Sequence, residues 1–190
     1  MKPLTPASPH AIIMVGIPGS GKSVFAERFA ETFRAPIISA TKLKRELELT
    51  DKAAQAIQTQ IISEYLKTKQ TFLVDGSFEK KQKRFELYRQ LTKAGYRPLV
   101  VWVQTDPGEA EYRATKPYPK GSGLSADEFK LMQKGFQSPS NLENPIVISG
   151  KHTYATQLKI VLKQLSVGSD RSVKPPQKPP RPHGRQVIIR

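Results

Sequence analysis

A glycine-rich run between two patterned segments constrains the fold of this chain more than any other feature. Residues 11–15 form an apolar run of strand length, and apolar side chains recur at helical spacing over residues 24–33. Between these segments lie Gly16, Ile17, Pro18, Gly19, Ser20, Gly21, Lys22 and Ser23. A strand, a glycine-rich turn and a helix in this order allow main-chain N–H groups to converge on an anion. The sequence therefore predicts a phosphate-binding loop at a strand-to-helix junction.

The residues of this loop have separate roles in binding a nucleotide. Gly16, Gly19 and Gly21 leave main-chain N–H groups uncovered by a Cβ atom. Lys22 is placed to reach the β- and γ-phosphates, and Ser23 is placed to ligate Mg²⁺ at the start of the following helix. We therefore expect ATP or GTP, together with Mg²⁺, as the bound cofactor.

Four further apolar runs of strand length follow the loop, each bounded by charged or turn residues. They cover residues 36–39, 71–74, 99–103 and 145–148. Apolar residues at helical spacing recur over residues 56–66, 85–91 and 158–165. Short buried strands that alternate with helices are typical of a parallel sheet with helices on both faces. We predict an α/β protein with the three-layer P-loop NTPase fold.

The chain divides into a patterned part and a tail of different composition. A length of 190 residues with 37% apolar content suits one domain with a substantial core. After residue 166 the sequence is dominated by proline, glycine, serine and basic residues, which favour an extended, flexible conformation. We predict a P-loop kinase-like domain over residues 1–166 and a tail over residues 167–190 that is a candidate for recruiting a protein partner.

The chain is strongly basic, with 31 Lys and Arg against 16 Asp and Glu and a net charge of +15. Such a surface attracts nucleic acids and nucleotide-containing substrates, although the same excess of charge also serves solubility. Cysteine is absent from the sequence, which excludes disulfides and Cys-based metal sites. Because no segment has the pattern of a signal peptide or a membrane span, we expect a cytoplasmic protein without a membrane partner.

Aspartates follow two of the predicted strands. Asp75 would lie at the C-terminal edge of the sheet, where open α/β sheets bind their ligands. Its carboxylate would hold the water shell of Mg²⁺ or act as a base, or alternatively it is a turn residue before Gly76. Asp106 invites the same argument more weakly, because Asp106-Pro107 is typical of the start of a helix.

Three basic residues, Arg113, Lys116 and Lys120, lead into or lie within a segment that interrupts the periodic pattern. Residues 116–125 contain two prolines and two glycines, which predicts a lid or loop. Phosphoryl transfer spreads negative charge over the moving group, and cations that close over this group stabilise the transition state. Arg113 is our candidate for that role, whereas Lys116 and Lys120 are as well explained as solvated loop charges.

The order of these motifs along the chain resembles that in P-loop kinases of the polynucleotide kinase and zeta toxin type, which are AAA-like P-loop NTPases. The resemblance covers about residues 10–166, and the loop from Gly16 to Ser23 is its most specific part. Asp75, Ser77 and Arg84 match an aspartate that ends a strand and the hydroxyl and arginine that follow it. The resemblance implies that Arg84 positions the substrate or the loop after Asp75.

The same resemblance extends into the later part of the chain. Arg113 looks like the lid arginine of the family, which contacts the nucleotide, and Lys116 stands where a second, substrate-binding arginine is usual. Residues 136–139 and Glu143 resemble the segment before the last strand. The resemblance therefore implies a nucleotide contact for Arg113 and a substrate contact for Lys116.

Thr41 departs from the family pattern. In such kinases an aspartate after the second strand accepts the proton of the substrate hydroxyl, and Thr41 occupies this place. Threonine cannot act as this base, and the loss of a positioned general base typically costs a factor of about 10²–10⁴. Either Asp75 substitutes, or transfer depends on positioning and electrostatics, or the chain binds nucleotide without transferring phosphate.

The sequence thus supports two main hypotheses from different classes. The first is an ATP-dependent kinase that phosphorylates a hydroxyl, with Lys22, Asp75 and Arg113 as catalytic residues. Its favoured acceptor is the 5′ end of a nucleic acid, because the surface is basic, with a small molecule or nucleotide sugar as the alternative. The second is a nucleotide-binding module without kinase activity that recruits a partner through its tail. A nucleotide hydrolase ranks last, because no water-positioning residue can be assigned.

Overall fold

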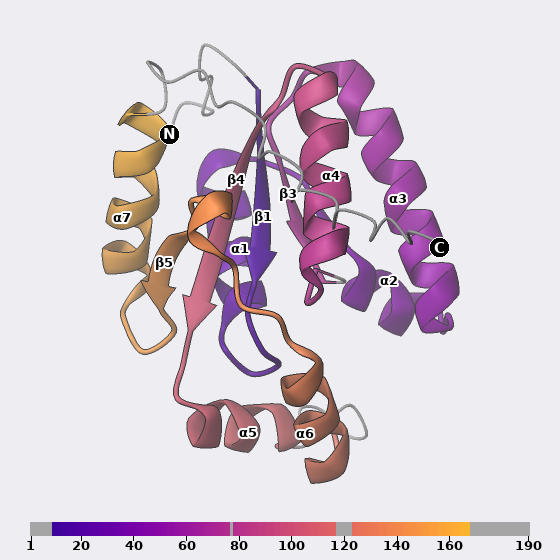
Figure 1. Ribbon diagram of the computed structural model, residues 1–190, viewed down its shortest axis with the longest axis vertical. Helices are drawn as coiled ribbons and strands as arrows, with labels where there is room; N and C mark the ends of the chain where they lie inside the picture. The colour runs from indigo at the N-terminus through magenta and orange to yellow at the C-terminus, as the bar shows by residue number, and fades with distance from the viewer. Residues whose placement is uncertain (1–8, 77, 117–122, 168–190) are drawn as a thin grey trace, which may run out of the picture.

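The computed structural model of the chain describes residues 9–76, 78–116 and 123–167. Five parallel strands form one sheet in the order β2-β3-β1-β4-β5 (Figure 1). The strands are β1 (His10–Val15), β2 (Ile37–Ser39), β3 (Phe72–Asp75), β4 (Arg97–Gln104) and β5 (Ile146–Ser149). All five predicted strands are confirmed, and so is their parallel arrangement.

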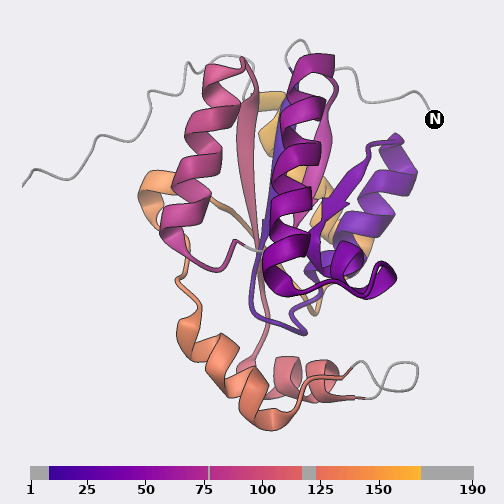
Figure 2. The same cartoon turned by 90° about the vertical axis from the view of Figure 1, so that its right-hand side faces the viewer.

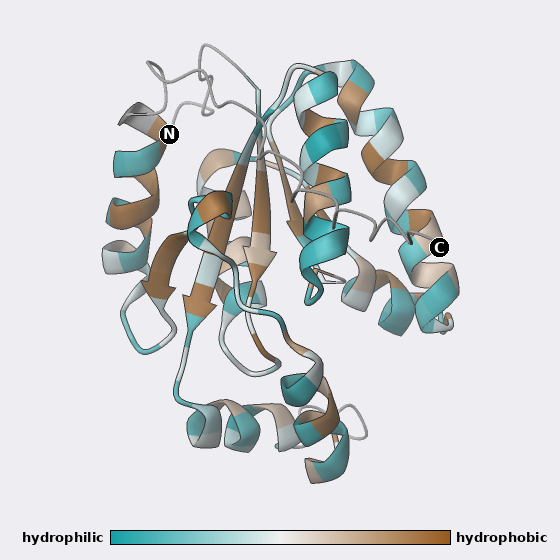
Figure 3. Ribbon diagram, in the orientation of Figure 1, coloured by the Kyte–Doolittle hydropathy of each residue, from teal (hydrophilic) through white to brown (hydrophobic). Residues whose placement is uncertain are grey.

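The central strand β1 is buried along its whole length. Ile13 of β1 pairs with Val74 of β3 on one side and with Val100 of β4 on the other. The strands appear as the most hydrophobic part of the ribbon in Figure 3, while polar residues are concentrated on the helices and loops. A strand that is covered on both faces requires apolar side chains in both directions, which explains the continuous apolar run of residues 11–15.

Helices cover both faces of the sheet (Figures 1 and 2). One apolar cluster joins the sheet to α1 (Lys22–Phe33) and α7 (Tyr154–Val167). The other joins it to α3 (Asp51–Thr68) and α4 (Lys81–Lys93). The predicted three-layer α/β fold is therefore confirmed, with two separate cores on either side of one sheet.

Two helices, α5 (Pro107–Thr115) and α6 (Ala126–Gly135), lie side by side beyond the C-terminal edge of the sheet (Figure 1). Asp106 caps α5 by accepting a hydrogen bond from the N–H of Glu109, which confirms the helix start predicted at Asp106-Pro107. Helix α6 is absent from our predictions, although Ser125 and Glu128 form a capping box at its start. Most of the predicted lid, residues 117–122, lies outside the described residues.

Two short elements complete the described chain, α2 (Ala40–Glu46) and the 3₁₀ helix η1 (Asn141–Glu143). The predicted tail, residues 167–190, lies outside the described residues beyond Val167, so the division into a domain and a tail stays a prediction. Within the described segments, none of the helices combines the length and the apolar content needed to cross a membrane.

Phe29 provides a test of the core on the α1 face. Its side chain is 0% exposed, and its ring centroid lies 5.9 Å from that of Phe25 and 4.6 Å from that of Phe33. We predict that Phe29→Ala lowers the free energy of unfolding by about 3–5 kcal/mol, because it removes a buried ring and leaves a cavity. Urea unfolding measures the loss, with Val24→Ala at an exposed position of the same helix as the control. Equal losses in the two variants would contradict this packing.

Candidate active site

The phosphate loop is held against the ends of β4 and β5 and against α5. A Cβ atom on Gly19, whose φ is 73°, would lie 2.0 Å from the carbonyl oxygen of Ala110 in α5. A Cβ atom on Gly150, just after β5, would lie 2.1 Å from the carbonyl oxygen of Ser20. The same Ser20 carbonyl accepts a hydrogen bond of 2.9 Å from the hydroxyl of Thr105. These close approaches require glycine and fix the loop in place.

The structure brings the loop together with Asp75, which is distant in sequence. The Ser23 hydroxyl donates a hydrogen bond of 2.8 Å to Asp75 Oδ2, and the Ser39 hydroxyl lies 3.5 Å from the same oxygen. The Lys22 ammonium donates a bond of 3.1 Å to the carbonyl of Ile17 within the loop. The strand-to-helix junction and the end of β3 therefore form one site, as the sequence predicts.

Asp75 is buried, with 3% of its surface exposed. Its second carboxylate oxygen, Oδ1, has no hydrogen-bond partner within the part of the chain that the structure describes. A buried charge is costly unless it is paired or coordinates a metal ion, and Mg²⁺ prefers oxygen ligands such as carboxylates. An unpaired carboxylate oxygen beside the Ser23 hydroxyl therefore fits Mg²⁺, with Ser23 and Asp75 as the residues that would hold it.

Lys22 lies in an environment with opposing influences on its charge. Burial lowers the pKa of its ammonium group, and the carboxylates of Asp75 and Glu79 raise it to a smaller extent. Phosphate oxygens close to Lys22 would add to the effect of the two carboxylates, because negative charge favours the protonated form. Bound nucleotide and the charged form of Lys22 therefore stabilise each other.

Gln58 is a residue of the site that sequence reasoning missed. Its side-chain amide, 2% exposed, donates one hydrogen bond of 3.0 Å to the carbonyl of Ile38 and another of 2.9 Å to the carbonyl of Asp75. The amide thus ties α3 to the ends of β2 and β3, which carry Ser39 and Asp75. The signal in the sequence is a glutamine on the apolar stripe that Ala54 and Ile62 define at helical spacing.

A small cavity of about 80 Å³ lies beside Asp75 and Ser23. Thr41, the second residue of α2, contributes to its lining, so the position where the base is missing lies in the same cavity as Asp75. Lys42 and Arg45 of α2 also line the cavity, and 58% and 67% of their side chains are exposed. Two carboxylates, those of Asp75 and Glu27, line the same cavity, so its charged lining is mixed.

Arg113 lies in the last turn of α5, close to the phosphate loop. Its guanidinium donates a hydrogen bond of 3.2 Å to the carbonyl of Gly150, the residue that packs on Ser20. It also pairs with Glu109, whose other carboxylate oxygen lies 3.2 Å from the Lys151 ammonium. The guanidinium is thus held beside the loop by neighbours on α5 and after β5, and its contact with a nucleotide stays a prediction.

Lys116 follows Arg113 but turns back along α5. Its ammonium lies 4.1 Å from the centre of the Tyr112 ring, and both residues are exposed. Nothing in the described residues places Lys116 against the phosphate loop, so its role as a substrate contact stays a prediction. Ser77 and Lys120 lie outside the described residues.

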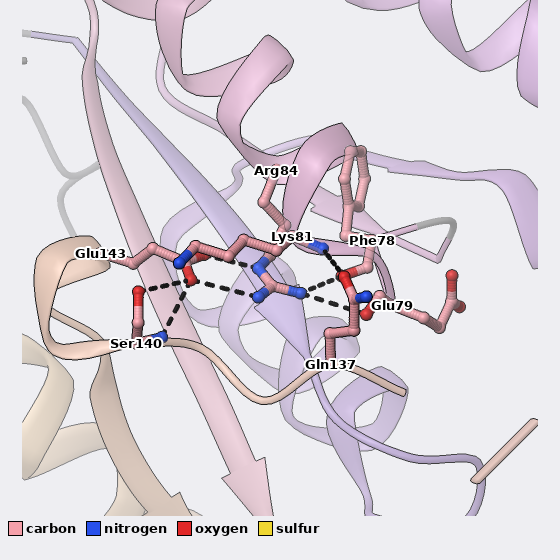
Figure 4. Close-up of polar contacts among 7 residues, drawn as sticks. All are labelled: Phe78, Glu79, Lys81, Arg84, Gln137, Ser140 and Glu143. Carbon is pink, nitrogen blue, oxygen red and sulfur yellow. Dashed lines mark hydrogen bonds and ion pairs between the residues drawn. The ribbon is translucent and has the colours of Figure 1, made fainter. Parts of the chain in front are cut away.

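Arg84 is buried and fully engaged (Figure 4). Its side chain is 1% exposed, and its Nε and Nη2 atoms lie 2.6 and 3.2 Å from the two carboxylate oxygens of Glu143. Its Nη1 atom donates bonds of 2.9 and 3.3 Å to the carbonyls of Phe78 and Glu79. Of the two roles implied for Arg84, this geometry supports positioning the loop after Asp75 rather than contact with a substrate.

The segment that leads to η1 is also bonded to residues 79–81, which follow β3 (Figure 4). The N–H of Gln137 donates a bond of 2.9 Å to the carbonyl of Glu79, and its side-chain oxygen accepts one of 2.8 Å from the N–H of Lys81. Glu143 in turn accepts a bond of 2.9 Å from the N–H of Ser140. Residues 78–84 and the segment before β5 are therefore bonded to each other at two places.

The fold and the loop together define a protein with the P-loop NTPase fold. Residues 12–139 match the model of the family described as AAA domain, and the chain belongs to this family. No curated protein matches the sequence.

Several solved structures share the fold at low sequence identity. A gluconokinase from Sinorhizobium meliloti 1021 is 19% identical with a TM-score of 0.64, over 85% of this chain and 94% of that one. A putative kinase from Chloroflexus aurantiacus is 16% identical with a TM-score of 0.69, over 85% and 98%. The APS kinase CysC from Mycobacterium tuberculosis, in complex with AMPPNP and APS, is 18% identical with a TM-score of 0.63, over 85% and 99%. At these identities the likeness establishes the fold alone.

Gln58→Leu tests the tie between α3 and the strand ends. We predict that it lowers the free energy of unfolding by about 1–3 kcal/mol, because two buried carbonyls lose their donor. It should also raise the Mg²⁺ concentration needed for nucleotide binding, because the end of β3 is less firmly held. Thermal unfolding and Mg²⁺ titrations measure both effects, with Gln55→Leu on the same helix as the control. A loss of stability without any change in Mg²⁺ dependence would contradict the positioning role.

The ion pair between Arg84 and Glu143 predicts a dependence of stability on pH. Burial alone would raise the pKa of Glu143, but hydrogen bonds from Arg84 and Ser140 and the charge of Arg84 together lower it below its usual value. A lowered pKa in the folded state stabilises the fold above the unfolded value of about 4.3, and this contribution is lost as the pH falls further.

We therefore expect the free energy of unfolding to fall as the pH drops below about 4.3, and this component to be absent in Glu143→Gln. At neutral pH the variant should lose about 3–5 kcal/mol, because the charge of Arg84 remains buried without its partner. Urea unfolding from pH 3 to pH 7 measures both effects. Glu109→Gln, which removes an exposed partner of Arg113, is the control and should cost much less. Identical pH profiles for Glu143→Gln and the unaltered protein would refute the assignment.

Proposed function

We propose that this chain is an ATP-dependent kinase that transfers the γ-phosphate to a hydroxyl of an anionic acceptor. The observation that carries the proposal is the contact of 2.8 Å between the Ser23 hydroxyl and Asp75, beside the phosphate loop. A hydroxyl and a carboxylate in this place are the groups that hold Mg²⁺ in P-loop proteins. The enzyme is a P-loop phosphotransferase.

The residues around the loop have distinct tasks in this proposal. Lys22 neutralises charge on the β- and γ-phosphates, and the loop N–H groups orient them. Ser23 and Asp75 would hold Mg²⁺, which would neutralise charge on the phosphates. Arg113 stabilises the charge that spreads over the transferred group, and Arg84 positions the loop that follows Asp75.

The acceptor proton has two routes in this site. Asp75 can accept it, or the proton leaves late, because a loose transition state demands little of a base. Thr41 cannot accept it, and the carboxylates that line the same cavity as Thr41 are those of Asp75 and Glu27. The choice between these routes affects rate and pH dependence but not the class of reaction.

One observation supports an anionic acceptor, the net charge of +15 that the whole chain carries. The structures with the same fold include a gluconokinase and an APS kinase, so the comparisons support a P-loop kinase, and not the polynucleotide kinase or zeta toxin type in particular. The 5′ end of a nucleic acid is therefore one candidate acceptor beside small molecules and nucleotide sugars.

A second candidate function rests on Thr41. If the threonine abolishes transfer, the chain is a nucleotide-binding module whose bound ATP sets a surface for a protein partner. This candidate requires tight nucleotide binding without turnover.

Transfer of labelled phosphate from γ-³²P ATP tests both candidates. The acceptor panel holds sugar acids, nucleoside monophosphates, a nucleotide sugar and 5′-hydroxyl oligonucleotides. We predict transfer to at least one acceptor, and a loss of about 10²–10³-fold in Lys22→Ala and in Asp75→Asn, because each removes charge stabilisation at the transferred group. Lys159→Ala, on the exposed side of α7, is the control. Binding of ATP without transfer to any acceptor would reject the kinase in favour of the nucleotide-binding module.

A further inference from the structure

A second cavity, of about 430 Å³, opens beside the phosphate loop and is distinct from the one that Asp75 lines. Its apolar lining comes from Ile17 of the loop, Trp102 of β4 and Phe136 of the segment between α6 and η1. Polar side chains, including Asp106 and Lys151, complete the lining. The volume and the mixture of aromatic and polar groups are those of a small-molecule site.

The position of Ile17 shows which end of a nucleotide the cavity would meet. Its carbonyl accepts a hydrogen bond of 3.1 Å from the Lys22 ammonium, and a P-loop lysine reaches the β- and γ-phosphates. The cavity therefore begins close to the positions of the β- and γ-phosphates. The body of an acceptor that reaches the γ-phosphate from this side would rest in the cavity.

The aromatic lining is firmly held. Trp102 and Phe136 are half-buried, and both pack against the apolar cluster between the sheet and the helices α3 and α4. The N–H of Phe136 donates a bond of 3.1 Å to the carbonyl of Gln133, and the next residue, Gln137, is bonded to Glu79. Figure 1 shows the segment from α6 to η1 running up in front of the sheet toward β4. Rings that are fixed before binding lose little freedom when a ligand stacks on them.

We propose that this cavity binds a planar heterocyclic base, so that the acceptor of the reaction is a nucleotide. Every base has a π-face that can stack on an aromatic side chain, and this contact tolerates differences between bases. An open-chain sugar acid such as gluconate has no planar π-face to stack on Trp102 or Phe136. The proposal rests on the proposed kinase function and specifies its acceptor, which is either a free nucleotide or the terminal nucleotide of an oligonucleotide.

Trp102 is the only tryptophan of the chain, so its fluorescence reports on the cavity directly. The donor site is first saturated with a non-hydrolysable ATP analogue. AMP, GMP, a 5′-hydroxyl dinucleotide and gluconate are then titrated separately. We expect a saturable change in Trp102 fluorescence with AMP, with GMP or with the dinucleotide, and none with gluconate. The compound with the lowest Kd shows whether the base belongs to a free nucleotide or to the end of an oligonucleotide.

Phe136→Ala should weaken the binding of the base-containing acceptor about tenfold, the size expected for the loss of one stacking contact. Its affinity for inorganic triphosphate should not change, because that probe carries no base. Phe136→Tyr keeps the ring and should bind as the unaltered protein does, which separates stacking from a general loss of structure. Phe85→Ala, at a half-buried aromatic residue of α4 outside the cavity, is the matched control.

Two outcomes would overturn the proposal. In the first, Phe136→Ala weakens the binding of the ATP analogue alone, which means that the cavity holds the base of the donor. In the second, base-containing compounds leave the fluorescence unchanged, while triphosphate still binds and this binding is lost in Lys22→Ala. The kinase function would survive either result, since transfer to a sugar acid would remain open to measurement. Loss of transfer to every acceptor would reject the kinase function itself.

Discussion

The burial of a carboxylate at the end of β3 is the constraint on which the rest of the site depends. A charge removed from water is costly unless other groups or a metal ion compensate it. Ser23 and Ser39 approach one oxygen of Asp75, and Gln58 bonds its main-chain carbonyl, while Oδ1 has no partner among the described residues. Ser39 on the neighbouring strand, Ser23 on α1 and Gln58 on α3 must all be in place for these contacts, so three elements meet at Asp75.

A second set of contacts couples the phosphate loop to the elements beyond the sheet. Gly19 packs on α5 and Gly150 packs on Ser20, so the loop cannot shift without moving α5 or the end of β5. Arg113 closes this arrangement through its bond to the carbonyl of Gly150. The helices that flank the predicted lid are thereby attached to the residues that cradle the phosphates.

The sequence was sufficient for the strands, the phosphate loop and Asp75, because each is written in a local pattern: an apolar run, a glycine spacing or an aspartate at a strand end. It was insufficient where a role depends on which side chains meet in three dimensions. In the sequence, Gln58 is one position of a helical stripe, and its bonds to the carbonyls of Ile38 and Asp75 are visible only in the structure. For Arg84 the sequence leaves two roles open, contact with a substrate or positioning of the loop after Asp75, and its pairing with Glu143 is visible only in the folded chain.

The cavity that Trp102 and Phe136 line is another feature that the sequence could not predict. Trp102 reads as a core residue of β4, and Phe136 follows a helix that no periodic pattern predicted. The two rings become part of one lining only in the folded chain. If positioning does most of the catalytic work at a site that has threonine in place of a base, then firm binding of the acceptor becomes decisive. In the proposed acceptor site, an aromatic lining that is held in place before binding would supply that orientation.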